Sequence, residues 1–146
     1  MQGIQKLTAR AQVRVRAPKQ KVWEALTSPR LIERYLFGTN AISDWKVGSP
    51  LVFKGEWQGK TYEDKGIILA SDQPSHFKYT YWSSMSGTED RPENYAEVSY
   101  DLKDAGNGET ELTVTQSNVA DEKVKKHSEE NWAAVLAGLK KVVEED

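Results

Sequence analysis

The chain has 146 residues, of which 20 are basic and 22 are acidic, so its formal net charge is −2. This length suits one domain with a buried core, and the scattered charges argue against nucleic-acid binding, which usually needs a dense basic stripe. The sequence has no cysteine, which excludes disulfides, thiolate nucleophiles and cysteine metal ligands. It shows neither a signal peptide nor an apolar run of the roughly 20 residues that span a membrane, so we expect a cytoplasmic protein.

The first predicted element is a strand over residues 7–15, where apolar and polar residues alternate strictly. Arginines occupy its outward positions, which is typical of an edge strand protected against mispairing; a basic binding patch is the less favoured interpretation. A short helix is predicted over residues 18–26. Ser28 and Pro29, a capping residue followed by a first-turn proline, then begin a second short helix that ends near residue 35.

The middle of the chain is predicted to form a series of strands. Most of them alternate between apolar and polar residues, and turn residues separate them. Gln58 with Gly59, and Asn107 with Gly108, predict tight hairpins, which join antiparallel neighbours. The predicted strands cover residues 44–47, 51–57, 61–71, 77–82, 95–102 and 109–118.

Residues 121–146 are predicted to form one long amphipathic helix, because apolar residues recur there at three- and four-residue steps. The predicted buried face carries Val124, Asn131, Trp132, Val135, Leu136, Leu139, Val142 and Val143. A strand, two short helices, about six further strands and a long helix together predict an α+β fold. We expect a single domain over residues 1–146, in which a curved antiparallel sheet wraps around the last helix.

Several short motifs, spread from residue 17 to residue 139, resemble those of a known family. They are 17–18 (AP) with 22–27 (VWEALT), 31–36 (LIERYL), 45–49 (WKVGS), 66–70 (GIILA) with 74–77 (PSHF), and 131–139 (NWAAVLAGL). The chain is similar to the START-like helix-grip superfamily, which includes lipid-transfer domains, birch-pollen-allergen-like proteins and polyketide cyclases. Within it, the chain resembles the branch named after the activator of heat-shock protein 90 ATPase. Ser49 and Asn131 stand where that branch usually has glycine.

The resemblance implies a cavity between the concave face of the sheet and the long helix, of a kind often used for apolar small molecules. Residues on the inward side of each strand should face it, with tyrosine hydroxyls fixing the orientation of a ligand. The predicted ligand-binding residues are Leu36, Phe37, Phe53, Trp57, Tyr79, Tyr81, Val98, Tyr100, Trp132, Leu136 and Leu139. The same side chains could instead pack against each other as core, which is the commoner role of aromatic stripes.

Two further features, a loop and a glycine, are each open to two interpretations. The loop over residues 83–94 is either a flexible surface loop or a lid over the cavity mouth, and Met85 is the residue that would dip into the opening. Gly138 in the last helix either allows close packing or keeps space open.

Catalytic chemistry finds little support in the sequence. His76 and His127 are far apart, and a structural or solvated role is favoured for both. Glu56, Glu63 and Asp64 flank a predicted hairpin and are interpreted as surface residues, which leaves tyrosines as the polar groups at inward positions. We therefore predict no catalytic residue, no metal and no cofactor.

Three functional hypotheses follow. The leading one is a cytoplasmic binding protein that holds an apolar or amphipathic small molecule in the cavity. The second is a module that binds a protein partner such as a chaperone, which exposed apolar residues on the outer sheet face, for example Trp82 or Val52, would support. The third is an enzyme resembling polyketide cyclases, which a charged group at an inward position would support.

Overall fold

The computed structural model describes residues 6–36, 38–84 and 87–145. In chain order its elements are β1 (Leu7–Val15), α1 (Lys19–Thr27), α2 (Pro29–Tyr35), β2 (Asn40–Ser43), β3 (Pro50–Trp57), β4 (Lys60–Asp72), β5 (His76–Ser83), the short 3-10 helix η1 (Pro92–Asn94), β6 (Ala96–Gly106), β7 (Glu109–Val119) and α3 (Glu122–Glu145).

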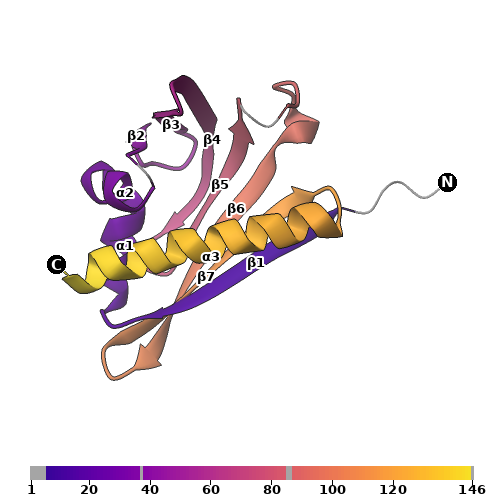
Figure 1. The fold of residues 1–146 in the computed structure, drawn as a ribbon. Helices are drawn as coiled ribbons and strands as arrows, with labels where there is room; N and C mark the ends of the chain where they lie inside the picture. Colours follow the sequence, from indigo (N-terminus) through magenta and orange to yellow (C-terminus); the bar gives the residue numbers. More distant parts are fainter. Residues whose placement is uncertain (1–5, 37, 85–86, 146) are drawn as a thin grey trace.

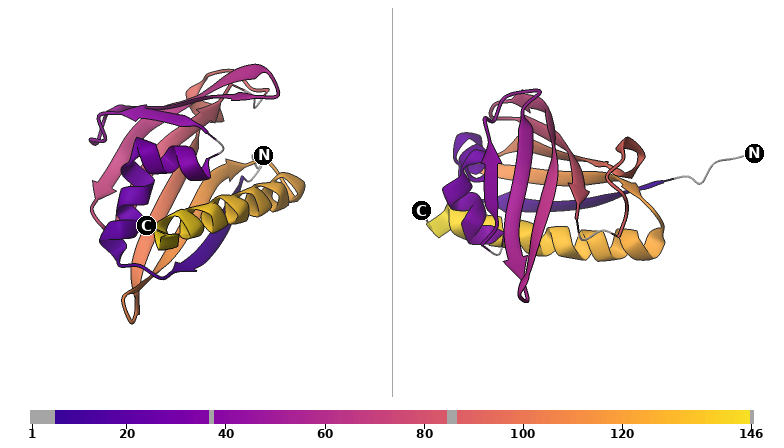
Figure 2. Two further views of the ribbon diagram at one scale, coloured as in Figure 1. Left: turned by 60° about the vertical axis from the view of Figure 1, so that its left-hand side comes forward. Right: turned by 90° about the horizontal axis from the view of Figure 1, so that it is seen from above.

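The described strands form one seven-stranded sheet in the order β1-β7-β6-β5-β4-β3-β2, and every neighbouring pair is antiparallel. The sheet curves around α3, and α1 and α2 lie at the C-terminal end of that helix (Figures 1 and 2). This arrangement confirms the predicted α+β helix-grip fold, including the two short helices after the first strand.

Both predicted hairpin turns are confirmed. Gln58 and Gly59 have φ angles of 50° and 79°, and Asn107 and Gly108 have φ angles of 56° and 74°. Positive φ at both central residues is the turn geometry whose twist matches that of antiparallel strands, and asparagine and glycine adopt it at low cost.

One predicted strand is wrong. Residues 44–47 form no strand, and β2 lies at Asn40–Ser43 instead, where it pairs with β3. The backbone of Trp45 is left-handed, with a φ of 62°, a conformation that does not continue a strand. Its half-buried ring packs against the core, with its centroid 6.3 Å from that of Phe77, so this apolar residue anchors a turn.

The predicted edge position of β1 is confirmed, and α3 contributes to its protection. Glu129 and Glu144 of α3 accept hydrogen bonds from the backbone N–H groups of Arg10 and Arg16, at 2.9 and 2.8 Å. Lys140 donates to a carbonyl group of the same strand at 3.0 Å. These side chains satisfy backbone groups that would otherwise be available to another strand.

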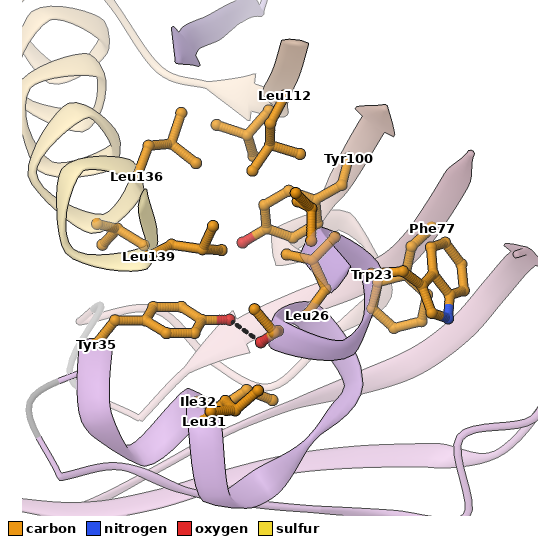
Figure 3. Packing of buried hydrophobic residues seen from close by; sticks show 14 of the residues in the cluster. Trp23, Leu26, Leu31, Ile32, Tyr35, Phe77, Tyr100, Leu112, Leu136 and Leu139 are labelled. Atoms are coloured by element: carbon orange, nitrogen blue, oxygen red, sulfur yellow. Dashed lines mark hydrogen bonds between the residues drawn. The ribbon is translucent and has the colours of Figure 1, made fainter. Parts of the chain in front are cut away.

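A large part of the core lies where α1, α2 and the C-terminal half of α3 meet the sheet (Figure 3). Trp23 of α1 packs edge-on against Phe77 of β5, with ring centroids 5.8 Å apart. The buried hydroxyl of Tyr35 donates a hydrogen bond to the carbonyl oxygen of Ala25 at 2.7 Å, which ties α2 to α1. Leu139 of α3 is fully buried against this cluster.

Gly138 lies where α3 packs against α2. A Cβ atom added at this position would lie 3.4 Å from the Cβ atom of Tyr35. Of the two interpretations of this glycine, the structure favours close packing, and the neighbour is a helix rather than the sheet.

The predicted buried face of the long helix is confirmed only toward its C-terminal half. The buried residues of α3 are Val135, Leu136, Leu139, Val142 and Val143. Val124 is 43% exposed and Asn131 is also exposed, so neither side chain is buried as predicted. Helical periodicity gives the direction of a side chain, but it does not say whether anything packs there.

Candidate functional site

A cavity of about 550 Å³ lies between the concave face of the sheet and the first half of α3. Its walls come from β3 to β7, from α3, and from the segment that joins α2 to β2. The lining residues are Leu36, Thr39, Phe53, Glu56, Tyr62, Asp64, Tyr79, Tyr81, Ser83, Tyr100, Gln116, His127, Ser128, Asn131, Trp132 and Val135. Its volume falls within the range of about 300–1,000 Å³ that is usual for small-molecule sites.

Aromatic rings form a continuous wall across the cavity. The centroid of Phe53 lies 5.9 Å from that of Tyr79 and 6.5 Å from that of Tyr81. Tyr79 lies 6.4 Å from Tyr100, which meets Trp132 of α3 edge-on at 6.0 Å. These distances are typical of favourable ring pairs, so each ring helps to hold its neighbours in place.

A glycine on β3 makes room for one of the lining tyrosines. Gly55 is paired with Tyr62 of β4, and a Cβ atom at Gly55 would lie 2.3 Å from the Tyr62 hydroxyl oxygen. Any other residue at this position would displace the ring. The Tyr62 hydroxyl shares a hydrogen bond with the hydroxyl of Thr39, which connects β4 to the segment before β2.

The polar end of the cavity is built around Asp64 of β4. The hydroxyl of Tyr81 donates a hydrogen bond to Asp64 Oδ2 at 2.6 Å. The other carboxyl oxygen, Oδ1, is buried and has no hydrogen-bond partner among the described residues. Burial raises the pKa of Tyr81 well above its usual range, and electrostatic repulsion by Asp64 and the hydrogen bond to it raise this pKa further.

Two more lining tyrosines are held in the neutral form. Burial is the largest cause of the raised pKa values of Tyr79 and Tyr100, whose ring centroids lie 6.4 Å apart. At neutral pH the cavity wall therefore offers hydroxyl groups rather than phenolate charges. At the α3 side, the indole N–H of Trp132 donates to Gln116 Oε1 at 2.8 Å.

The structure separates the predicted ligand-binding residues into three groups. Those that line the cavity are Leu36, Phe53, Tyr79, Tyr81, Tyr100 and Trp132. Val98, Leu136 and Leu139 are buried in the core and do not line the cavity. Phe37, Met85 and the side chain of Trp57 lie outside the described residues.

Sequence reasoning missed most of the polar lining, and the interpretation of Asp64 as a surface residue is wrong. Asp64 pairs with Phe53 on one side and with Ser83 on the other, and all three line the cavity. Counting back in steps of two from the buried Ile68 places Asp64 and Tyr62 on the inward side of β4. The alternation of this strand therefore contained the signal.

The two histidines differ in their relation to the cavity. His127 is exposed and lines the cavity from the first half of α3. His76 does not line the cavity; its Nδ1 lies 2.8 Å from Oδ1 of its cross-strand neighbour Asp101.

The described part of the loop after β5 is attached to the outer face of the sheet. The indole N–H of Trp82 donates to Thr88 Oγ1 at 3.1 Å, and Trp82 stacks on Tyr95. Lys65 lies 2.6 Å from the carboxyl group of Asp90, and the hydrogen bond between them raises the pKa of the lysine and lowers that of the aspartate. A lid role for Met85 therefore stays a prediction.

Two kinds of feature are absent from the described residues. No group of three or more histidine, aspartate or glutamate side chains within them has an arrangement that could hold a metal ion. None of the helices in these ranges is both long and apolar enough to cross a membrane.

Comparison with known proteins gives one family match and many similar structures. A family model described as "Activator of Hsp90 ATPase homolog 1-like protein" matches residues 16–144. No curated protein sequence matches significantly. The solution structure of ChR145 from Cytophaga hutchinsonii shares 46% identity with the chain, with a TM-score of 0.84, and the match covers 99% of this chain and 97% of that one.

Two more distant structures show the fold alone. An HSP90 activator from Plasmodium falciparum is 17% identical, with a TM-score of 0.74, over 94% of this chain and 96% of that one. DynU16, a putative protein in the dynemicin biosynthetic locus, is 19% identical, with a TM-score of 0.77, over 94% of this chain and 47% of that one.

Proposed function

The chain belongs to the family of activator of Hsp90 ATPase homolog 1-like proteins, and from this premise we propose that it is a cytoplasmic protein that binds an apolar or amphipathic small molecule. The ligand occupies the space between the sheet and the first half of α3. The observation that carries the proposal is a cavity of about 550 Å³ with a continuous aromatic wall. Concave, mostly apolar sites with a few placed polar groups are where proteins usually bind small molecules.

Packing considerations support this use of the cavity. Protein interiors contain few voids larger than a water molecule, because unfilled space forfeits dispersion contacts. Tyr81 and Trp132 point inward yet remain only partly buried. A ligand that covers both rings gains apolar burial of about 25 cal/mol per Å² without rearranging the core.

Thermal unfolding in the presence of candidate ligands tests the proposal. The panel contains flavonoids, fatty acids, sterols and aromatic polyketides. A ligand at 100 times its dissociation constant adds about 2.7 kcal/mol, which raises the Tm of a domain of this size by roughly 5–10 °C. We expect at least one class to produce such a shift.

Two tryptophan variants locate the effect. Trp132→Ala removes a ring from the cavity wall and should abolish the shift, whereas Trp82→Ala removes a ring from the outer face of the sheet and should preserve it. The proposal is refuted if no class shifts the Tm, or if the shift is the same in Trp132→Ala as in the unmodified protein.

Exposed apolar residues on the outer sheet face favour a second candidate function, the binding of a protein partner such as a chaperone. Ile42 of β2 and Ile67 of β4 are 47% and 48% exposed. Leu69 of β4 and Val47, in the turn between β2 and β3, are also exposed, and Ile42 pairs in register with the half-buried Val52. Scattered apolar residues are normal on a surface, but a group on adjacent strands is typical of an interaction site.

The chaperone candidate has a direct assay. If the chain acts as its family name describes, it should stimulate the ATPase of an Hsp90 protein, and Ile67→Asp should reduce that stimulation. Glu63→Gln, an exposed change on the same strand, is the matched control. The absence of stimulation by the unmodified protein would rule this candidate out.

Asp64 supplies the inward-facing charged group that the cyclase hypothesis requires, and the carboxyl group of Glu56 also lines the cavity. The hydroxyl of Tyr81 donates a hydrogen bond to Asp64, and burial raises the pKa of Tyr81, so this tyrosine does not exchange a proton with Asp64 near neutral pH. Mass spectrometry of a ligand recovered after incubation separates the two cases, because a binding protein returns it unchanged.

A further inference from the structure

Asp64 lines the cavity, and its carboxyl group is incompletely hydrogen-bonded. The hydroxyl of Tyr81 donates a hydrogen bond to Oδ2 at 2.6 Å, while Oδ1 is buried and has no hydrogen-bond partner among the described residues. A buried polar atom without a partner has lost its hydrogen bonds to water, and native proteins rarely leave one in that state without a reason. An acceptor of this kind calls for a hydrogen-bond donor.

The other charged side chains of the cavity define what kind of donor fits. Glu56 lines the cavity from β3, which adds a second acidic group. Neither lysine nor arginine appears among the described lining residues, and His127 is the only basic side chain there. Two acidic groups without a strong base give a negative potential that repels an anionic ligand and attracts a cation.

The aromatic wall points to the same ligand class. Tyr79, Tyr81, Tyr100, Phe53 and Trp132 line the cavity together with Asp64. The faces of aromatic rings attract an ammonium group electrostatically, and tryptophan and tyrosine do so best. The same rings bury the apolar part of an amphipathic molecule.

Resting on the proposed function, we propose that the ligand of this cavity is an amphipathic amine, whose protonated nitrogen binds the Asp64 carboxyl group while its apolar body lies against the aromatic wall. The site therefore selects against fatty acids and other carboxylates. No covalent step is involved.

Two matched ligand series test the inference. One series is 2-(2-naphthyl)ethylamine, 2-(2-naphthyl)ethanol and 2-naphthylacetic acid; the other is dodecylamine, 1-dodecanol and dodecanoic acid. Dissociation constants are measured at pH 7 by calorimetry. A charge-assisted hydrogen bond contributes about 1.5–3 kcal/mol, so in at least one series we expect the amine to bind about tenfold or more tightly than the alcohol, and the acid to bind most weakly.

Two variants assign the preference to one residue. Asp64→Asn keeps the size of the side chain and removes its charge, so the preference for the amine should fall to within about threefold of the alcohol. Glu63→Gln removes a charge from the neighbouring, exposed position of β4 and should leave all the dissociation constants unchanged. Thermal unfolding checks that both variants are folded. The preference of the unmodified protein for the amine over the alcohol and the acid tests the inference even without the variants.

The outcomes separate this inference from the proposed function. Equal binding of amine, alcohol and acid, tighter binding of the acid, or an undiminished amine preference in Asp64→Asn would overturn the inference and leave small-molecule binding intact. If no member of either series binds, the inference fails. If the wider ligand panel also produces no shift in Tm, the proposed function fails with it.

Discussion

The two halves of α3 face the same curved sheet but meet it in different ways. Toward its C-terminus the apolar face is buried, and α1 and α2 fill the remaining space around Leu136 and Leu139. Toward its N-terminus the same helix presents His127, Asn131 and Trp132 to a cavity. The apolar face of α3 is therefore buried where α1 and α2 pack between the helix and the sheet, and it borders a cavity where they do not.

The chemistry of the two halves differs accordingly. We call the region around the C-terminal half of α3 the filled half and the region around the cavity the hollow half. In the filled half, Trp23 and Phe77 pack edge-on, and the hydroxyl of Tyr35 donates a hydrogen bond to a backbone carbonyl group. In the hollow half, hydroxyl and carboxyl groups are mixed with the rings, and one oxygen of Asp64 lacks a partner. A space that is meant for a ligand needs such groups, whereas a space that is meant for packing does not.

Alkaline pH should destabilise the regions around both halves of α3, because buried tyrosines lie in each of them. Burial raises the pKa values of Tyr35, Tyr79, Tyr81 and Tyr100 above the ordinary value of 10.0. The folded protein therefore retains protons that the unfolded chain releases above about pH 10, so stability is fully present below that pH and falls as pH rises further. Each such tyrosine contributes up to about 1.4 kcal/mol per pH unit, or about 5 kcal/mol per pH unit for all four.

Urea unfolding between pH 8 and pH 11.5, with tyrosinate absorbance recorded in parallel, measures this effect. Tyr35→Phe should reduce the slope by about 1.4 kcal/mol per pH unit. Ionisation of all the tyrosines near pH 10 while the protein remains folded would contradict the burial described here.

Matched leucine truncations sharpen the comparison. Leu139→Ala in the filled half should destabilise the protein by about 3 kcal/mol, because it opens a void in a fully packed region. Leu36→Ala should cost about 1 kcal/mol, because this half-buried side chain already borders the cavity. Urea unfolding measures both, and equal losses would show that the two halves are packed alike.

Removing single hydroxyl groups probes the same contrast at a smaller scale. Tyr35→Phe should lower the free energy of unfolding by about 1–2 kcal/mol, since the carbonyl of Ala25 loses a buried partner. Tyr62→Phe should cost less than about 0.5 kcal/mol, because water in the cavity can replace the lost bond to Thr39. A larger loss of stability in Tyr62→Phe than in Tyr35→Phe would show that water does not reach the cavity hydroxyls.

The smallest expected change lies in the filled half, where α3 passes α2. Gly138→Ala should raise the free energy of unfolding by about 0.5–1 kcal/mol, because alanine is the better helix former. The new Cβ atom meets the Cβ atom of Tyr35 at 3.4 Å, which is an ordinary contact. A loss of stability would show that the two helices need the closer approach.

The fold follows from the sequence because alternation, hairpin dipeptides and helical periodicity are local signals. Asn107 with Gly108 is an example, since the turn needs no information from the rest of the chain. The strand predicted at residues 44–47 fails because the left-handed backbone of Trp45 is set by the packing of its ring on the core.

The site is less predictable, because it depends on which residues become neighbours across strands. Tyr81 and Trp132 follow from inward parity and line the cavity. Asp64 has the same parity on β4, yet its proximity to a turn suggests a surface residue until the register places it between Phe53 and Ser83. Val98 also faces inward and pairs with the cavity-lining Tyr79 and Gln116, yet it is fully buried and does not line the cavity.

The most direct test of the central claim follows two tryptophan indole N–H signals by NMR during titration with whichever panel ligand raises the Tm most. Trp132 donates to Gln116 beside the cavity, whereas Trp23 is buried against Phe77 in the filled half. The account predicts that the Trp132 signal shifts saturably while the Trp23 signal stays in place. A ligand that stabilises the protein but leaves the Trp132 signal unmoved would contradict it.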